Sequence, residues 1–377
     1  MNGITNNLRT PYTQQFNLAF QQELGQGLTT SISYVGSLTR HASNFVNINS
    51  SPVLIPLCNS AGPGGQPTNL PCGNSNAQNP FSDVNISYQL NDGLAAYHSL
   101  QGKLEKRFGR NLGFLTTYTW SHQMTDSGTA IAQNDNFSGV GSAPNYYLFG
   151  TREGYANGPE DVRNRFTLNG NYTLPVGKGQ RFLNNNGVLN QALGGWQTTL
   201  TEQIQGGEPL TVGTSNFTGV SGLTQNAILI RDPFAGGGTP DPSLNFPAGA
   251  TCPTKVRTLA AWFNPCAFKN PLPASAVTGV ITTAAQAAPF LGDRAGRISG
   301  PGYNRTNMSL FKSFPVYRES QLQLRADIFN VLNTPAFILT GGNNGPNGAV
   351  ISPGSYRFFQ NNTPNSRFFQ FALRYSY

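Results

Sequence analysis

The residues with the most distinctive spacing are four cysteines, which form two pairs of equal separation. Cys58 and Cys72 lie in one stretch rich in Pro, Asn and Gly, and Cys252 and Cys266 lie in another. Neither stretch contains a Cys-x-x-Cys motif or a nearby histidine, so the spacing disfavours a zinc site. Two local disulfides in loops of an oxidising compartment fit better, with three pairings formally open. Each would close a loop of about 15 residues and stabilise it by roughly 3 kcal/mol.

Catalytic chemistry finds little support in the remaining reactive side chains. His41, His98 and His122 are isolated, with no Ser or Cys nucleophile motif beside them. The stretch PVGKGQ lacks the first glycine and the final Ser or Thr of a phosphate-binding loop, so we interpret it as a turn. We therefore expect no enzymatic activity, no cofactor and no metal site.

Charged residues cluster only weakly. Asp161, Arg163 and Arg165 could form an active group, but the simpler interpretation is that they face an aqueous lumen and pair with neighbours such as Glu105. We extend that interpretation to seven charges on the polar side of strand-like segments, which are Lys103, Glu105, Arg107, Arg163, Arg165, Arg325 and Asp327.

The overall composition is unusual for a soluble protein. Charged residues make up 11% of the 377 residues, against roughly 25% in ordinary soluble domains. Asn, Gln, Ser, Thr and Gly replace the missing charge, and the mean hydropathy stays negative. Aromatic residues are 11% of the chain, whereas disordered chains have few of them. This balance suits strands that face lipid on one side and a wet lumen on the other.

The sequence also disfavours a helical membrane protein and a nucleic-acid-binding protein, and it shows no secretory signal. The chain has no run of about 18 apolar residues, so we expect no transmembrane helix; the best stretch, 276–291, is interrupted by Thr, Gln and Pro and is expected to be a loop. The first residues lack the basic start and apolar core of a secretory signal. The net charge of +8 comes from scattered Lys and Arg without a nucleic-acid motif, so we expect no nucleic-acid partner.

Period-two alternation of apolar and polar residues predicts nine strands. These segments are 11–24, 28–35, 95–108, 111–121, 163–174, 194–205, 303–314, 321–330 and 367–377.

The last of them is the most informative. One side of the strand is apolar and aromatic to the very end of the chain, through Phe369, Phe371, Leu373, Tyr375 and Tyr377. In a soluble protein such an edge would be an aggregation hazard. The stretch resembles the C-terminal assembly signal of outer-membrane β-barrels, and that resemblance implies recognition by the barrel-insertion machinery.

Connections between the predicted strands alternate between short and long. Short ones begin at Gly25, Gly109, Pro175 and Pro315, and the long ones are 37–94, 122–162, 206–302 and 334–366. Transmembrane barrels have short periplasmic turns and long extracellular loops. The pattern therefore predicts an all-β, antiparallel transmembrane barrel in the outer membrane, with every cysteine outside the cell. Its interfacial aromatic residues would include Tyr118, Trp120, Tyr172 and Trp196.

Two alternatives remain open at this stage. A secreted or surface β-sandwich could bind glycans or proteins through the long loops. A small self-contained barrel or porin would need an even strand count, whereas nine is odd. The odd count, the missing secretory signal and a start within an expected extracellular loop all favour the C-terminal part of a larger barrel.

A set of segments, in order along nearly the whole chain, resembles the Oar-like TonB-dependent receptors. The segments are RTPYTQQFNLAFQQEL, SYVGS, YHSLQGKLEKRF, YTWSH, DVRNRFTLNGNYTLP, LGGWQ, WFNPCAF, GRISGPGYNRTNMSLFKSF and LRADIFNVLNTPAF. No single segment is decisive, whereas the ordered set is specific.

The resemblance implies that residues 1–377 form the C-terminal portion of a 22-stranded barrel. The plug and the carboxypeptidase-regulatory-like domain of the family have no counterpart in this sequence. In that family TonB drives import of a large nutrient, such as a siderophore, oligosaccharide or peptide. The implied partners are outer-membrane lipid, the insertion machinery, an unknown nutrient and TonB, the last only through the missing N-terminal part.

Overall fold

The computed structural model describes the strands, the turns and part of the long loops. The described residues are 2–47, 86–107, 109, 111–126, 150, 154–158, 160–184, 187–213, 226–244, 251–258, 261–272, 276, 282–317, 320–335, 337–339, 358–360 and 366–377. Cys58 and Cys72, one of the two predicted cysteine pairs, lie outside these ranges.

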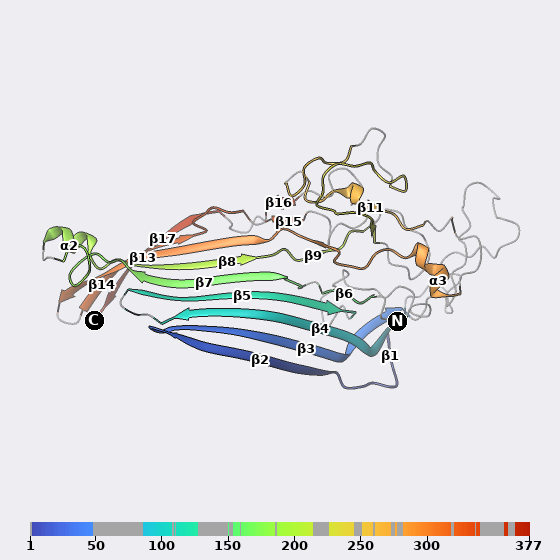
Figure 1. Cartoon of the computed structure of the whole chain (residues 1–377), viewed down its shortest axis with the longest axis horizontal. Coiled ribbons are helices and arrows are strands. Elements are labelled where there is room, and N and C mark those ends of the chain that lie inside the picture. Colours follow the sequence, from blue (N-terminus) through green and yellow to red (C-terminus); the bar gives the residue numbers. More distant parts are fainter. Residues whose placement is uncertain are drawn as a thin grey trace, which may run out of the picture.

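Nine long strands form one antiparallel sheet in which every neighbour in space is also the next long strand in sequence (Figure 1). All nine predicted strand segments are present, and the two face-packed sheets of a sandwich are not formed by them. The strands are β2 (Tyr12–Gly25), β3 (Leu28–Asn47), β4 (Ser87–Lys106), β5 (Leu112–Thr125), β7 (Asn164–Thr173), β8 (Gln197–Gln205), β13 (Tyr303–Tyr317), β14 (Ser320–Phe329) and β17 (Phe368–Ser376).

The four short connections lie at one end of the sheet, which we call the short-turn end, and the C-terminus lies there as well (Figure 1). The tightest of them joins β2 to β3 through Gly25, Gln26 and Gly27, all with positive φ angles of 52° to 91°. Glycine adopts this left-handed backbone without a Cβ clash, which explains its use on both sides of Gln26. The opposite end, which we call the loop end, carries the long connections.

Two strands are longer than the sequence pattern predicts. The segment 37–94 was expected to be irregular, but β3 continues to Asn47 and β4 begins at Ser87. The extension contains two register shifts and a positive φ of 58° at His41. Main-chain pairing continues there although apolar alternation has ended, so the side chains alone gave no signal. The first residues were also expected to be loop, but β1 (Asn2–Ile4) pairs in parallel with β4.

The segment 206–302, which we call the loop cap, is folded in its described parts and was wrongly expected to be irregular. It contains β9 (Pro209–Leu210), β10 (Ile228–Leu229), η2 (Pro265–Ala267), β11 (Phe268–Lys269), α3 (Ala284–Ala287), η4 (Ala288–Phe290) and β12 (Ile298–Ser299). Strand β9 pairs with β12, and β10 pairs with β11. Two further short strands, β15 (Phe337–Leu339) and β16 (Phe358–Gln360), pair beyond β14, and β6 (Ala156–Asn157) pairs with β5.

The buried hydrophobic cluster of this protein lies in the loop cap, not against the sheet. Its fully buried members are Val212, Ala227, Leu244, Phe263, Ala267, Phe268 and Ile298. These residues come from stretches too short to show a period, which is why the alternation analysis missed them. None of the helices in the described ranges is long and apolar enough to cross a membrane.

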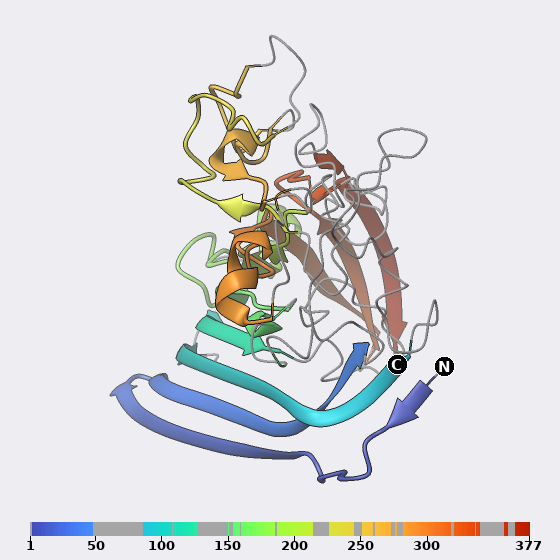
Figure 2. The ribbon, with the colours of Figure 1, turned by 90° about the vertical axis from the view of Figure 1, so that its right-hand side faces the viewer.

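The sheet curls into an open arc (Figure 2). Its path begins at β17 and ends at β2, and within the described residues these two strands are paired along one edge only. Every residue of β2 and of β17 is exposed. The arc therefore presents two free edges.

Candidate functional site

One face of the sheet, which we call the apolar face, exposes large hydrophobic side chains from edge to edge. A single row of paired residues crosses six strands as Phe20, Ile32, Gly102, Tyr118, Phe166 and Ile204. The exposed fraction is 76% for Leu18 and 77% for Phe371. A contiguous surface of this kind marks contact with an apolar partner.

The predicted interfacial aromatic residues lie on this face at two heights along the strands. Tyr172 and Trp196 lie towards the short-turn end, and Tyr118 and Trp120 lie towards the loop end. Trp120 lies eight residues after Leu112 on β5, and Leu112 pairs with Tyr172. Eight residues span roughly 27 Å along a strand, or about 20 Å vertically at a tilt of about 40°. That spacing is close to an apolar band about 25 Å tall between two aromatic girdles. Trp196 lies at the short-turn level, where its indole donates to the main-chain oxygen of Ala192 at 2.9 Å.

The C-terminal strand completes this surface. Its side chains Phe369, Phe371, Leu373 and Tyr375 lie opposite Ile328, Ala326, Leu324 and Leu322 of β14, respectively. Beyond the end of β17, Tyr377 stacks on Tyr375 with ring centroids 6.2 Å apart.

Several ionisable side chains interrupt the apolar face, among them two lysines and one glutamate. By register, Lys106 shares it with Phe114, Glu202 with Leu168, and Lys312 with Leu324. Lys106 lies near the short-turn end, where a long side chain can reach water, whereas Lys312, also near that end, is buried. Glu202 is farther from that end, and its Oε1 atom is buried without a hydrogen-bond partner among the described residues.

The opposite face, which we call the polar face, carries the predicted lumen-facing charges. Lys103 and Glu105 form an ion pair at 2.7 Å, so the proposed pairing of Glu105 with Arg163 or Arg165 is not what the structure shows. Arg325 pairs with Asp327 at 2.9 Å. Two further predicted charges also lie on this side: Arg165 stands opposite Thr119 and Gln205, and Arg107 lines a 340 Å³ hollow with Gln21, Glu23, Gly27 and Thr29.

At the loop end, Asp161 is the centre of a buried charge cluster. Its side chain is 2% exposed and accepts from Arg163 Nε at 2.8 Å and from the main-chain N–H of Gln123 at 2.8 Å. His122 Nδ1 lies 3.1 Å from the same carboxylate. The carboxylate is therefore satisfied by neighbours that hold the start of β7 against β5. The role of His122 could not be read from the sequence, because 38 residues separate it from Asp161.

The loop cap is held to the rest of the loop end by polar contacts. Asn157 donates to the main-chain oxygen of Gly296 at 2.7 Å, and Arg294 donates to that of Tyr155 at 3.2 Å. Burial raises the pKa of Tyr155, and the Asp126 carboxylate raises it further, with Arg40 acting in the opposite direction.

Within the loop cap, the structure joins Cys252 to Cys266 in a disulfide with the Cα atoms 5.9 Å apart. Both residues are buried. Nearby, hydrogen bonds from the side chain and the main chain of Ser243 lower the pKa of Asp241. Among the described residues there is no group of three or more His, Cys, Asp or Glu side chains that could hold a metal ion.

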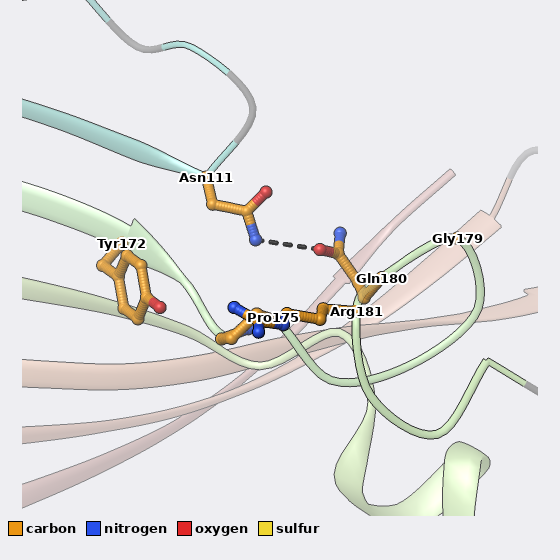
Figure 3. A pocket seen from close by; sticks show the side chains of 6 residues that line it. All are labelled: Asn111, Tyr172, Pro175, Gly179, Gln180 and Arg181. Atoms are coloured by element: carbon orange, nitrogen blue, oxygen red, sulfur yellow. Dashed lines mark hydrogen bonds between the residues drawn. The ribbon is translucent and has the colours of Figure 1, made fainter.

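A cavity of about 460 Å³ lies at the short-turn end, where the connection between β7 and β8 folds back beside β5 (Figure 3). Its lining residues are Asn111, Tyr172, Pro175, Gly179, Gln180 and Arg181. Asn111 donates to Gln180 Oε1 at 2.8 Å, which fixes the wall of the cavity. The same connection contains the helix α2 (Val188–Leu193). A polar turn was expected here from the sequence, so neither the helix nor the cavity was predicted.

Comparison with known proteins agrees with this geometry. The family of outer membrane beta barrel domains matches residues 1–370. Among solved structures, the outer membrane transporter YddB from Escherichia coli aligns with 98% of this chain at 11% identity and a TM-score of 0.44. The alignment covers 33% of that chain, so the present chain spans about a third of the transporter's length. No curated protein matches the sequence. The chain belongs to the outer membrane beta barrel domain family, and its place is the outer membrane.

Proposed function

We propose that this chain is the C-terminal part of the barrel of an Oar-like TonB-dependent receptor, which imports a large nutrient across the outer membrane. The observation that best supports the proposal is the open sheet. Strands β2 and β17 each leave one edge unpaired within the described residues. A spanning sheet cannot leave main-chain N–H and C=O groups facing hydrocarbon, because each unsatisfied group costs several kcal/mol. Further strands must therefore pair with both edges.

The polar face supports transport through the completed barrel. It presents Gln, Thr and Ser with ion-paired charges such as Lys103 with Glu105, which suits a hydrated interior. Small barrels fill their interior with side chains, whereas large barrels enclose a channel or a plugged lumen. Here the polar face of β2 and of β17 is exposed, which favours a wide barrel over a small self-contained one.

The orientation follows from the unequal ends of the sheet. We assign the short-turn end to the periplasm and the loop end to the cell exterior, as in other transmembrane barrels. The loop cap and its disulfide then face the medium, where a disulfide persists. A folded, disulfide-bonded cap at the mouth of the barrel is suited to first contact with a nutrient such as a siderophore, oligosaccharide or peptide.

The proposal is tested in the organism that encodes the chain. Accumulation of labelled siderophores, oligosaccharides and peptides would be compared among wild-type cells, cells lacking this gene and cells lacking TonB. We expect both deletions to abolish accumulation of the same nutrient class, and gene complementation to restore it. If the gene deletion removes an accumulation that continues without TonB, the chain is a passive porin and the receptor proposal is wrong.

A further inference from the structure

The connection between β7 and β8, residues 174–196, is attached to the apolar face of the sheet by Lys312. The Lys312 side chain is on the apolar face, paired in register with Leu324, yet the residue is only 5% exposed. Its ammonium donates to the main-chain oxygens of Gln191 and Ala192, the latter at 3.3 Å. These carbonyls lie in the last turn of α2, where the helix dipole favours a cation. Lys312 therefore holds α2 on the side of the sheet that faces lipid.

The helix exposes apolar side chains on one side. Val188, Leu189 and Leu193 are 82%, 64% and 52% exposed. With Ala192 they fall within about 140° of the helical circle at 100° per residue, and Asn190 lies on the other side. The helix lies on the apolar face at the level of Trp196, so lipid is the occupant that the surrounding surface is suited to contact.

Every charged residue of this connection is positive. Residues 174–196 contain Lys178 and Arg181 but no Asp or Glu. The Arg181 guanidinium lies 5.5 Å from the centre of the Phe182 ring, and Phe182 is itself exposed. Arg181 has no ion-pair partner among the residues that the structure describes. Basic residues beside exposed Leu, Val and Phe are typical of segments that lie in the headgroup region of an anionic membrane surface.

The 460 Å³ cavity provides a place for a headgroup. Arg181 lines it together with Tyr172, which is at the aromatic level of the short-turn end, and with the polar side chains of Asn111 and Gln180 (Figure 3). A guanidinium beside amide and hydroxyl groups is well suited to bind phosphate oxygens.

We propose that the described residues of the 174–196 connection, 174–184 and 187–196, form a lipid-binding element, in which the apolar side of α2 enters the membrane interface and the Arg181 cavity takes the phosphate of an anionic phospholipid. The assignment to the periplasmic leaflet depends on the orientation proposed above, whereas the binding of anionic lipid does not. The inference is independent of TonB and of the nutrient.

The position of α2 is tested with a polarity-sensitive fluorophore on single cysteines in isolated outer membranes. The variants are Leu189→Cys on α2, Phe371→Cys on β17 and Ile230→Cys, an exposed site in the loop cap, with labelling of the wild-type chain subtracted. We expect the probes at positions 189 and 371 to report an apolar environment and the probe at 230 to report water. If position 189 matches 230 while 371 is apolar, the α2 inference is wrong and the membrane placement stands. If all three report water, both are wrong.

The headgroup site is tested by measuring phosphatidylglycerol retained on the full chain after extraction in mild detergent. We expect Arg181→Gln to lower the retained lipid about fivefold, because one cation near an anionic surface contributes about that factor. Arg374→Gln, an exposed cation on the polar face of β17, is the matched control and should retain the wild-type amount. Equal retention by both variants would overturn the proposed site. Displacement of the lipid by equimolar inorganic phosphate would reassign the cavity to free phosphate and would likewise overturn it.

Discussion

Leu168 of β7 lies directly opposite Glu202 of β8, so an aliphatic side chain and a carboxylate share the apolar face of the sheet. The Oε1 atom of Glu202 is buried, and no group in the part of the chain that the structure describes forms a hydrogen bond with it. Burial of an unsatisfied polar atom costs about 1–3 kcal/mol. Glu202 therefore lowers the stability of the folded sheet at its apolar face.

From this relationship we expect Glu202→Leu to stabilise the folded chain by about 1–3 kcal/mol. The measurement is the urea concentration at which the compact, heat-modifiable form is lost on cold gel electrophoresis of outer membranes. Thr201→Leu, on the same strand and the opposite face, is the control and should give no gain. A lower midpoint for Glu202→Leu would mean that the carboxylate is stabilised by its surroundings.

Replacement of Phe371 by Lys should impair membrane assembly. Phe371 is 77% exposed on the apolar face, and a lysine facing lipid near the middle of the membrane costs roughly 2–4 kcal/mol. Leu168→Lys should act in the same direction. Gln370→Lys is the matched control, since Gln370 pairs with Asp327 on the polar face. The measurement is the amount of each variant in the outer-membrane fraction. Equal amounts for the variants at positions 370 and 371 would contradict the assignment of the faces.

Removal of the Cys252–Cys266 disulfide should destabilise the loop cap alone. The bond closes a loop with a sequence separation of 14 residues, which corresponds to about 3 kcal/mol. We expect the Cys252→Ser/Cys266→Ser variant to be cleaved faster in the loop cap by added protease on intact cells. Its heat-modifiable migration should match that of the wild type, because the sheet has its own hydrogen bonds. A loss of membrane insertion would show that the cap and the sheet fold as one unit.

Acid should loosen the loop cap through Asp241. Hydrogen bonds from Ser243 lower the pKa of Asp241 in the folded state. The stabilisation is therefore present above the unfolded pKa of about 3.9 and is lost as the pH falls through the lower folded pKa. Ser243 also accepts from the main-chain N–H of Asn270 at 2.9 Å, so the loss should spread to the end of β11.

The measurement is the rate of cleavage in the loop cap by an acid-active protease between pH 2 and pH 5. We expect the wild-type chain to become more sensitive as the pH falls, and Asp241→Asn to be sensitive at every pH with a flatter profile. Identical pH profiles for the two chains would exclude Asp241 as the titrating group.

The sequence predicted the sheet well because lipid imposes a strict rule on it. Along β17, Phe369, Phe371 and Leu373 alternate with Gln370 and Ala372, since each side of a spanning strand meets a different solvent. The same rule fails outside the membrane. The extension of β3 beyond Gly36 has no apolar alternation, so the predicted strand ended too early.

The loop cap and the α2 connection were beyond prediction for a different reason. Phe263 and Phe268 contact each other in a buried cluster with Val212 and Ile298, and no local period marks residues that meet across such separations. Lys312 likewise carries no sign in its strand that it holds a helix more than 100 residues earlier in the chain.

The sequence by itself determined which side chains share a face of the sheet, how many long strands form it and at which end the short turns gather. These properties are local, because a strand places successive side chains on opposite faces. Only the tertiary structure decided the pairing register, the free edges at β2 and β17, the folded core of the loop cap and the docking of α2 by Lys312. Each of these depends on contacts between distant segments, which are selected by packing and main-chain hydrogen bonding and leave no periodic trace along the chain.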